Sequence, residues 1–104
     1  MIKKDESISK TIEWLFSVFG ISSIEIVDYW EADLCAIGIR RKGVENKLIY
    51  ISTFGKKDSL YDFEIEECRK NSDTEYDVLD KGENITRDEL KSKIKEFLFA
   101  DNEV

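Results

Sequence analysis

The chain of 104 residues contains no proline and no histidine, and only five glycines, two cysteines and one methionine. Without histidine it cannot form an imidazole-based catalytic triad, an imidazole acid–base pair or a zinc site with histidine ligands. The two cysteines, Cys35 and Cys68, are too few for a zinc site made of cysteine alone. We expect them to be reduced, partly buried thiols, with a disulfide as the alternative.

Long apolar runs and low-complexity linkers are also absent. No stretch approaches the roughly 18 apolar residues of a membrane span. The basic pair Lys3-Lys4 is followed by Asp5-Glu6 instead of an apolar segment, which does not fit a signal peptide. We therefore expect a single domain over residues 1–104, located in the cytoplasm, with no membrane partner.

Acidic side chains are abundant. The chain has 23 Asp and Glu against 16 Lys and Arg, a net charge of −7. The charge is uneven, because residues 36–57 carry a net +5 and residues 58–89 a net −8. An acidic surface repels nucleic acid and anionic membranes and attracts basic proteins. Direct binding of nucleic acid is therefore not expected.

Apolar residues at helical spacing predict a helix at each end of the chain. The first has an apolar stripe and ends near Gly20, where a left-handed cap fits; the stripe consists of Ile8, Ile12, Leu15, Phe16 and Phe19. The second spans Thr86 to Phe99 and begins with Thr86-Arg87-Asp88-Glu89, the pattern of a capping box. Ile85 and Leu90 are placed to form the accompanying hydrophobic staple.

Between these helices the apolar period changes to two, which predicts five strands. The expected strands are Ile24–Trp30, Leu34–Arg41, Lys47–Phe54, Leu60–Glu67 and Thr74–Lys81. Their short connections favour antiparallel hairpins. The sequence therefore predicts an α+β fold with an N-terminal helix, a five-stranded antiparallel meander and a C-terminal helix, both helices lying on one sheet face.

The fourth expected strand alternates between apolar and acidic residues. One side carries three carboxylates spaced roughly 7 Å apart, and the next strand adds two. If the two strands pair, five carboxylates share one exposed face: Asp62, Glu64, Glu66, Glu75 and Asp77. Like charges across paired strands destabilise a sheet by roughly 0.2–1 kcal/mol each. Such a face is expected to serve a partner, and a solvated, aggregation-resistant sheet is the alternative.

A basic protein fits an acidic face of this kind, and nucleases that grip phosphate backbones are basic. Carboxylates covering the substrate groove of such an enzyme would both block it and speed its capture by electrostatic steering. Aromatic side chains often anchor an interface. The candidates for that role are Tyr29, Trp30, Tyr61 and Tyr76, and Tyr61 is grouped with the five carboxylates as the expected binding site.

Two other chemical interpretations remain open. Asp62-x-Glu64-x-Glu66 could hold Mg²⁺ in a metal-dependent hydrolase, but no lysine or histidine is fixed nearby in the sequence to activate water. An acidic chain could also mimic nucleic acid and block a DNA-binding enzyme. The favoured expectation is a binding protein with no catalytic residues, no cofactor and no metal.

Three segments carry a likeness to a known family: Asn46–Gly55, Tyr61–Glu66 and the capped helix Thr86–Phe99. With its acidic, proline-free composition and helix–meander–helix layout, the chain resembles the small immunity proteins of bacterial contact-dependent growth inhibition. The resemblance implies a non-enzymatic inhibitor. Its partner would be the C-terminal nuclease domain of the cognate toxin, a DNase, tRNase or other RNase. Some toxins of this kind act with a host translation factor, which would be a further partner reached through the toxin.

Overall fold

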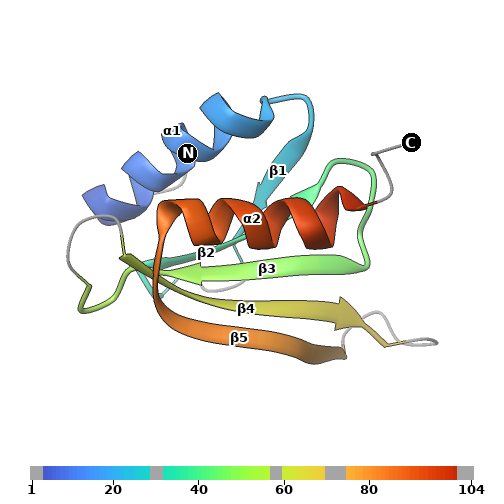
Figure 1. Ribbon diagram of the computed structural model, residues 1–104. Coiled ribbons are helices and arrows are strands. Elements are labelled where there is room, and N and C mark those ends of the chain that lie inside the picture. Colours follow the sequence, from blue (N-terminus) through green and yellow to red (C-terminus); the bar gives the residue numbers. More distant parts are fainter. Residues whose placement is uncertain (1–3, 29–31, 57–59, 70–74, 101–104) are drawn as a thin grey trace.

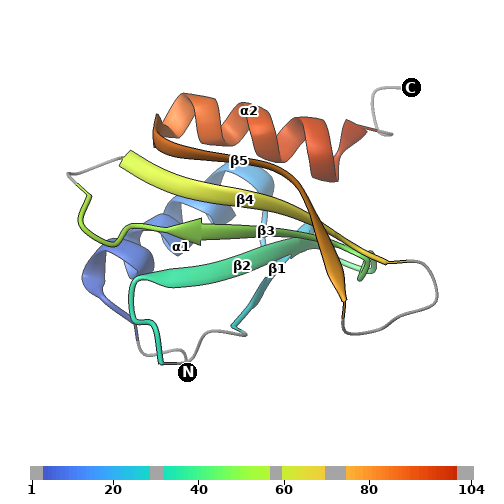
Figure 2. The ribbon, with the colours of Figure 1, turned by 90° about the horizontal axis from the view of Figure 1, so that it is seen from below.

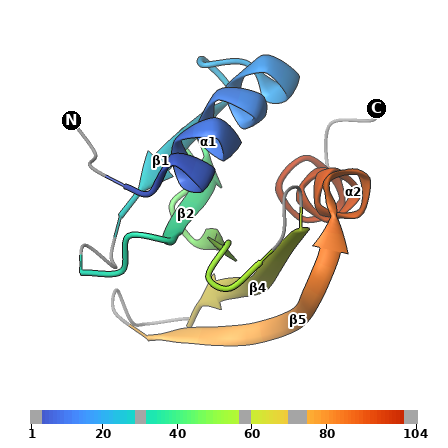
Figure 3. The same ribbon diagram turned by 90° about the vertical axis from the view of Figure 1, so that its left-hand side faces the viewer.

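The computed structural model describes residues 4–28, 32–56, 60–69 and 75–100. The elements in chain order are α1 (Glu6–Phe19), β1 (Ile24–Val27), β2 (Ala36–Arg41), β3 (Lys47–Ser52), β4 (Leu60–Cys68), β5 (Tyr76–Thr86) and α2 (Arg87–Leu98). The strands form one antiparallel sheet in the order β1-β2-β3-β4-β5, and Figure 2 shows them side by side. Both helices lie on the same side of the curved sheet (Figure 1 and Figure 3). The α+β meander predicted from the sequence is confirmed.

The sheet has two faces of different character. The inner face packs against the helices, and the outer face carries the side chains that alternate with it. One hydrophobic core joins the inner face to both helices, and its buried members are Ile8, Leu15, Ile24, Ile37, Ile39, Ile49, Ile51, Tyr61, Phe63, Ile65, Leu90, Ile94 and Leu98. The core therefore uses the apolar stripes predicted for both helices.

Local signals in the sequence fix the helix ends. Helix α1 starts after Asp5, whose side chain caps it, and ends at Gly20, which takes a φ of 90°. The capping box of α2 is present: the backbone N–H of Glu89 donates to Thr86 Oγ1 at 3.2 Å, and that of Thr86 donates to Glu89 Oε1 at 2.8 Å. These caps satisfy N–H groups that have no partner within the helix.

Strand β5 runs further than expected. The sequence Gly82-Glu83-Asn84 is typical of a turn, yet the strand continues through it to Thr86, which is also the N-cap of α2. Asn84 takes a positive φ of 56°, and the pairing with β4 shifts register at two places, as β-bulges do. Gly82 lies opposite Phe63, and a Cβ there would lie 2.6 Å from the Phe63 ring. Glycine is therefore required by packing and does not end the strand.

The other strand ends differ from the expected ones by small amounts. Strand β2 begins at Ala36 instead of Leu34, and β3 ends at Ser52 instead of Phe54. Strand β4 reaches Cys68, one residue further than expected. Trp30 and Thr74, expected at a strand end, lie outside the described residues.

Candidate functional site

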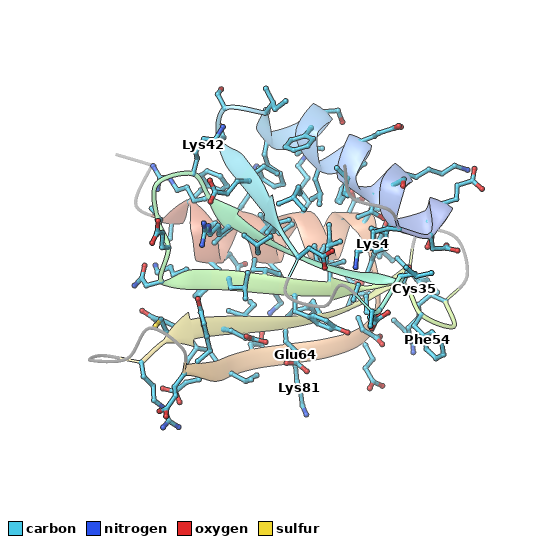
Figure 4. The ribbon with its side chains drawn as sticks, turned by 180° about the vertical axis from the view of Figure 1, so that it is seen from behind. Lys4, Cys35, Lys42, Phe54, Glu64 and Lys81 are labelled. Atoms are coloured by element: carbon cyan, nitrogen blue, oxygen red, sulfur yellow. The ribbon has the colours of Figure 1, made fainter. Side chains whose placement is uncertain are left out.

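The outer face of β4 carries three of the carboxylates expected at a binding surface. Asp62, Glu64 and Glu66 alternate with the buried residues of this strand and lie opposite Ser52, Tyr50 and Leu48 of β3. Figure 4 looks onto this face, with α2 behind the strands. No helix covers it in the described part of the chain, and the three side chains are half-buried among their neighbours. The alternation predicted for this strand is confirmed.

Glu75 and Asp77 do not join these three carboxylates. The register of β4 and β5 turns Tyr76 and Val78 to the outer face, and Asp77 to the opposite side. Both acids bind Arg69, whose Nη1 lies 3.1 Å from Glu75 Oε1 and whose Nε lies 2.8 Å from Asp77 Oδ1. The expectation of five carboxylates on one face is therefore wrong, because a shift of one residue in register moves every side chain to the other face.

Tyr61 is a core residue and not an exposed anchor. It is 2% exposed, its ring stacks on that of Trp14 with centroids 6.3 Å apart, and its hydroxyl accepts a hydrogen bond from Arg87 Nε at 3.0 Å. A partner at the surface cannot reach this side chain, so the expectation that Tyr61 contacts a partner is corrected. Tyr29 and Trp30, two other aromatic candidates, lie outside the described residues.

A hollow of about 510 Å³ lies on the outer face beside the β4 carboxylates. We call it the acidic hollow. It is formed by the last part of β3, the first part of β4 and the middle of β5, together with the segment before β2. Its lining residues are Asp33, Tyr50, Ser52, Phe54, Asp62, Phe63, Glu64, Lys81, Gly82 and Glu83.

Contacts from the N-terminus position Asp33 at the hollow. The Lys4 side chain is 1% exposed and its ammonium lies 3.0 Å from Asp28 Oδ1. The same ammonium donates to the Asp33 carbonyl oxygen at 2.7 Å. The backbone N–H of Asp5 donates to the Leu34 carbonyl oxygen at 2.9 Å. These contacts hold the segment before β2 at the edge of the outer face.

The charges of the hollow are only partly compensated. Lys56 Nζ lies 3.0 Å from Asp62 Oδ1 and donates to Asn84 Oδ1 at 2.9 Å. The backbone N–H of Asn84 donates to Asp62 Oδ1 at 3.1 Å, and Lys81 lies opposite Glu64 across the strands. Within the described residues, four carboxylates and one lysine line the hollow, so counting Lys56 as well gives a net charge of −2. The hollow therefore favours a cation.

The negative potential of this face acts on its own ionisable groups. Burial raises the pKa of the Tyr50 hydroxyl, a hydrogen bond with Ser52 lowers it, and three carboxylates of the hollow raise it further. Burial also raises the pKa of Glu66, and both a hydrogen bond with Glu64 and repulsion between the two groups add to this. The phenol of Tyr50 thus stays neutral, and an added positive charge would relieve the crowding of carboxylates.

Of the ten residues that line the hollow, only Asp62 and Glu64 were expected at a site; Asp33, Tyr50 and Phe54 are among the eight that were not. Phe54 precedes Gly55, which takes a φ of 68° in a turn. An aromatic residue next to a glycine at the end of an apolar run is the signal that could have placed it at the surface. Asp33 had no such signal, because contacts from a distant segment position it.

Three further features bear on metal binding, on the cysteines and on membrane crossing. Among residues 4–28, 32–56, 60–69 and 75–100, no three acidic or cysteine side chains come close enough together to hold a metal ion. Cys35 and Cys68 are both half-buried, as expected. Neither of the helices found in these residues has the length and apolar character needed to cross a membrane.

The chain was compared with known proteins by sequence and by structure. No protein-family model matches it, and no curated protein or solved structure matches it either.

Proposed function

We propose that this chain is an immunity protein, a non-enzymatic inhibitor that binds a cationic nuclease toxin domain in the cytoplasm and neutralises it. The observation that carries the proposal is the line of Asp62, Glu64 and Glu66 on an uncovered sheet face, next to a hollow of net charge −2. The resemblance to immunity proteins of contact-dependent growth inhibition points the same way.

The electrostatics support inhibition by occlusion. A nuclease must present a cationic surface to bind the phosphate backbone, so an acidic sheet face is complementary to its substrate groove. Complementary charge raises the association rate more than it raises affinity, and the effect weakens as salt is added. The proposed interface contains fewer carboxylates than the sequence suggested, because Glu75 and Asp77 form ion pairs with Arg69.

The test compares two double charge reversals in the binding of the cognate nuclease toxin domain. Glu64→Lys/Glu66→Lys changes the outer face, and Glu75→Lys/Asp77→Lys makes the same change in net charge off that face. The first is expected to lower the association rate by about ten- to a hundred-fold at low salt, and less at moderate salt. The second is expected to change the rate much less.

Equal effects of the two variants would show that total charge and not the outer face governs binding. Inhibition itself is measured separately by titrating the wild-type chain into a nuclease assay. Complete loss of activity at one equivalent is expected for an occluding inhibitor. If the chain neither binds nor protects against this nuclease, the proposed function is wrong.

A further inference from the structure

Phe54 stands out on the outer face because it is large, apolar and 73% exposed. Hydrogen bonds fix the turn that carries it: the Thr53 N–H donates to the Cys35 carbonyl oxygen at 2.9 Å, and the Lys56 N–H donates to the Thr53 carbonyl oxygen at 3.0 Å. The Phe54 N–H itself donates to Ser52 Oγ at 3.2 Å. An exposed aromatic ring on a fixed backbone loses little entropy when it is covered.

The ring lines the acidic hollow together with the carboxylates. Leu34, 55% exposed, follows Asp33 directly in the chain and adds a second apolar side chain at this end of the sheet. Figure 4 shows Phe54 at this end, with Glu64 and Lys81 nearer the middle of the strands and Lys42 at the far end. Apolar surface and negative charge thus lie next to each other here.

We infer that the acidic hollow, with Phe54 at its edge, is the centre of the partner interface, in place of the line of β4 carboxylates as a whole. Its occupant is a basic loop of a protein partner that places one arginine or lysine in the acidic hollow and packs apolar surface on Phe54. The inference rests on the proposed function. It adds that Phe54 anchors the complex and that the hollow receives a guanidinium or ammonium group of the partner.

Charge complementarity selects this occupant. A hollow with four carboxylates and a net charge of −2 repels a phosphate or an acidic peptide and attracts a guanidinium or ammonium group. An isolated inorganic cation would leave Phe54 uncovered. A side chain carried by a protein loop uses both features at once, as interface hot spots do when charged contacts surround a buried aromatic residue.

The first experiment probes the hollow with small molecules that differ only in charge. Amide chemical shifts of the full chain are followed by NMR during titration with arginine amide and, as the matched control, citrulline amide, in which a neutral urea replaces the guanidinium. Both compounds are N-acetylated, so that neither carries an α-ammonium group. Saturable shifts confined to Tyr50, Ser52 and Phe54 and their neighbours are expected for arginine amide alone. No saturable shift, or the same shifts with both compounds, would overturn the assignment of a cation site.

The second experiment tests the anchor with the cognate nuclease toxin domain. Phe54→Ala is expected to weaken binding at least about thirtyfold, mainly through faster dissociation and with little dependence on salt. Ile21→Ala is the matched control, because Ile21 is also apolar and 71% exposed but lies beside Lys42, whose ammonium donates to its carbonyl oxygen. This substitution is expected to leave binding unchanged.

The outcomes separate the two proposals. If the domain binds tightly to the wild type and to Phe54→Ala alike, the inferred anchor is wrong and the proposed function stands. If the domain does not bind the wild-type chain at all, the proposed function fails, and the arginine amide titration still reports whether the hollow accepts a cation.

Discussion

Strand β4 has nine residues, which point alternately to the inner and the outer face of the sheet, and the two faces differ in their properties. On the inner face, Tyr61, Phe63 and Ile65 are at most 6% exposed and belong to the core. On the outer face, carboxylates alternate with them and remain in contact with solvent. The inner face is determined by packing against two helices, so its residues have little freedom to change. The outer face has no such constraint, and its charge is therefore the part of the strand that can be specialised for a partner.

The largest effect is expected from substitutions that contrast these faces directly. Phe63→Ala removes a buried ring and should lower the free energy of unfolding by about 3–5 kcal/mol. Glu64→Ala, its neighbour on the outer face, should change it by no more than about 0.5 kcal/mol. Urea unfolding of both variants measures the difference, with Phe63→Leu as a milder substitute if Phe63→Ala does not fold. Similar losses for the two residues would mean that the outer face also contributes to the stability of the fold.

A second, smaller effect is expected in β5, where Gly82 faces the Phe63 ring. Gly82→Ala places a methyl group against this ring and should lower the free energy of unfolding by about 1–3 kcal/mol. Lys81→Ala next to it is the control and should stay within about 0.5 kcal/mol of the wild type. Because the clash is with one residue, combining Gly82→Ala with Phe63→Leu should cost less than the sum of the two single changes. Additive losses would show that the glycine is needed for another reason.

The smallest effects concern two carboxylates whose pKa values shift in opposite directions. Burial raises the pKa of Glu66 on the outer face, so the folded chain binds more protons than the unfolded one just above the ordinary value of 4.5. Stability from this group therefore falls as the pH rises through that window. Glu66→Gln should raise the urea midpoint at neutral pH and leave it unchanged well below 4.5. If Glu66→Gln instead lowers the stability at neutral pH, the raised pKa of Glu66 is wrong.

Asp80 provides the opposite case. A hydrogen bond from Lys93, whose Nζ lies 3.0 Å from Asp80 Oδ2, lowers the pKa of Asp80 below 3.8. The unfolded chain then binds more protons just below 3.8, so stability from this group is present above that value and is lost as the pH falls. Asp80→Asn should lower the urea midpoint slightly at neutral pH and have no effect in strong acid. The same small loss at every pH would rule out an ionic origin.

Much of the fold could be predicted from the sequence because its signals are local. The apolar stripe of α1, the capping box at Thr86 and the alternation along β4 each depend on residues within one element. The length of β5 could not be predicted in this way. Gly82 and Asn84 are typical of a turn, and only pairing with β4 shows that they belong to a bulged strand.

The candidate site was predicted less completely, because a surface depends on how several elements meet. The sequence identified the carboxylates of β4 but placed Asp77 with them, since the register between two strands cannot be determined from either strand alone. Tyr61 was expected to contact a partner, although it occupies the same side of the alternating pattern as Phe63 and Ile65, which are buried. Asp33 is held at the hollow by contacts from Lys4 and Asp5, which lie far from it in the sequence.

Thr86 ends an edge strand and starts a helix, with no linker between them. Edge strands lack a neighbour on one side and usually fray. Here, a shift of β5 by one residue would break the capping box between Thr86 and Glu89 and would displace Ile85 from its packing against the core. Helix α2 is anchored in the core by Leu90, Ile94 and Leu98, so a shift of this end of β5 requires either the loss of the capping box or the movement of a packed helix.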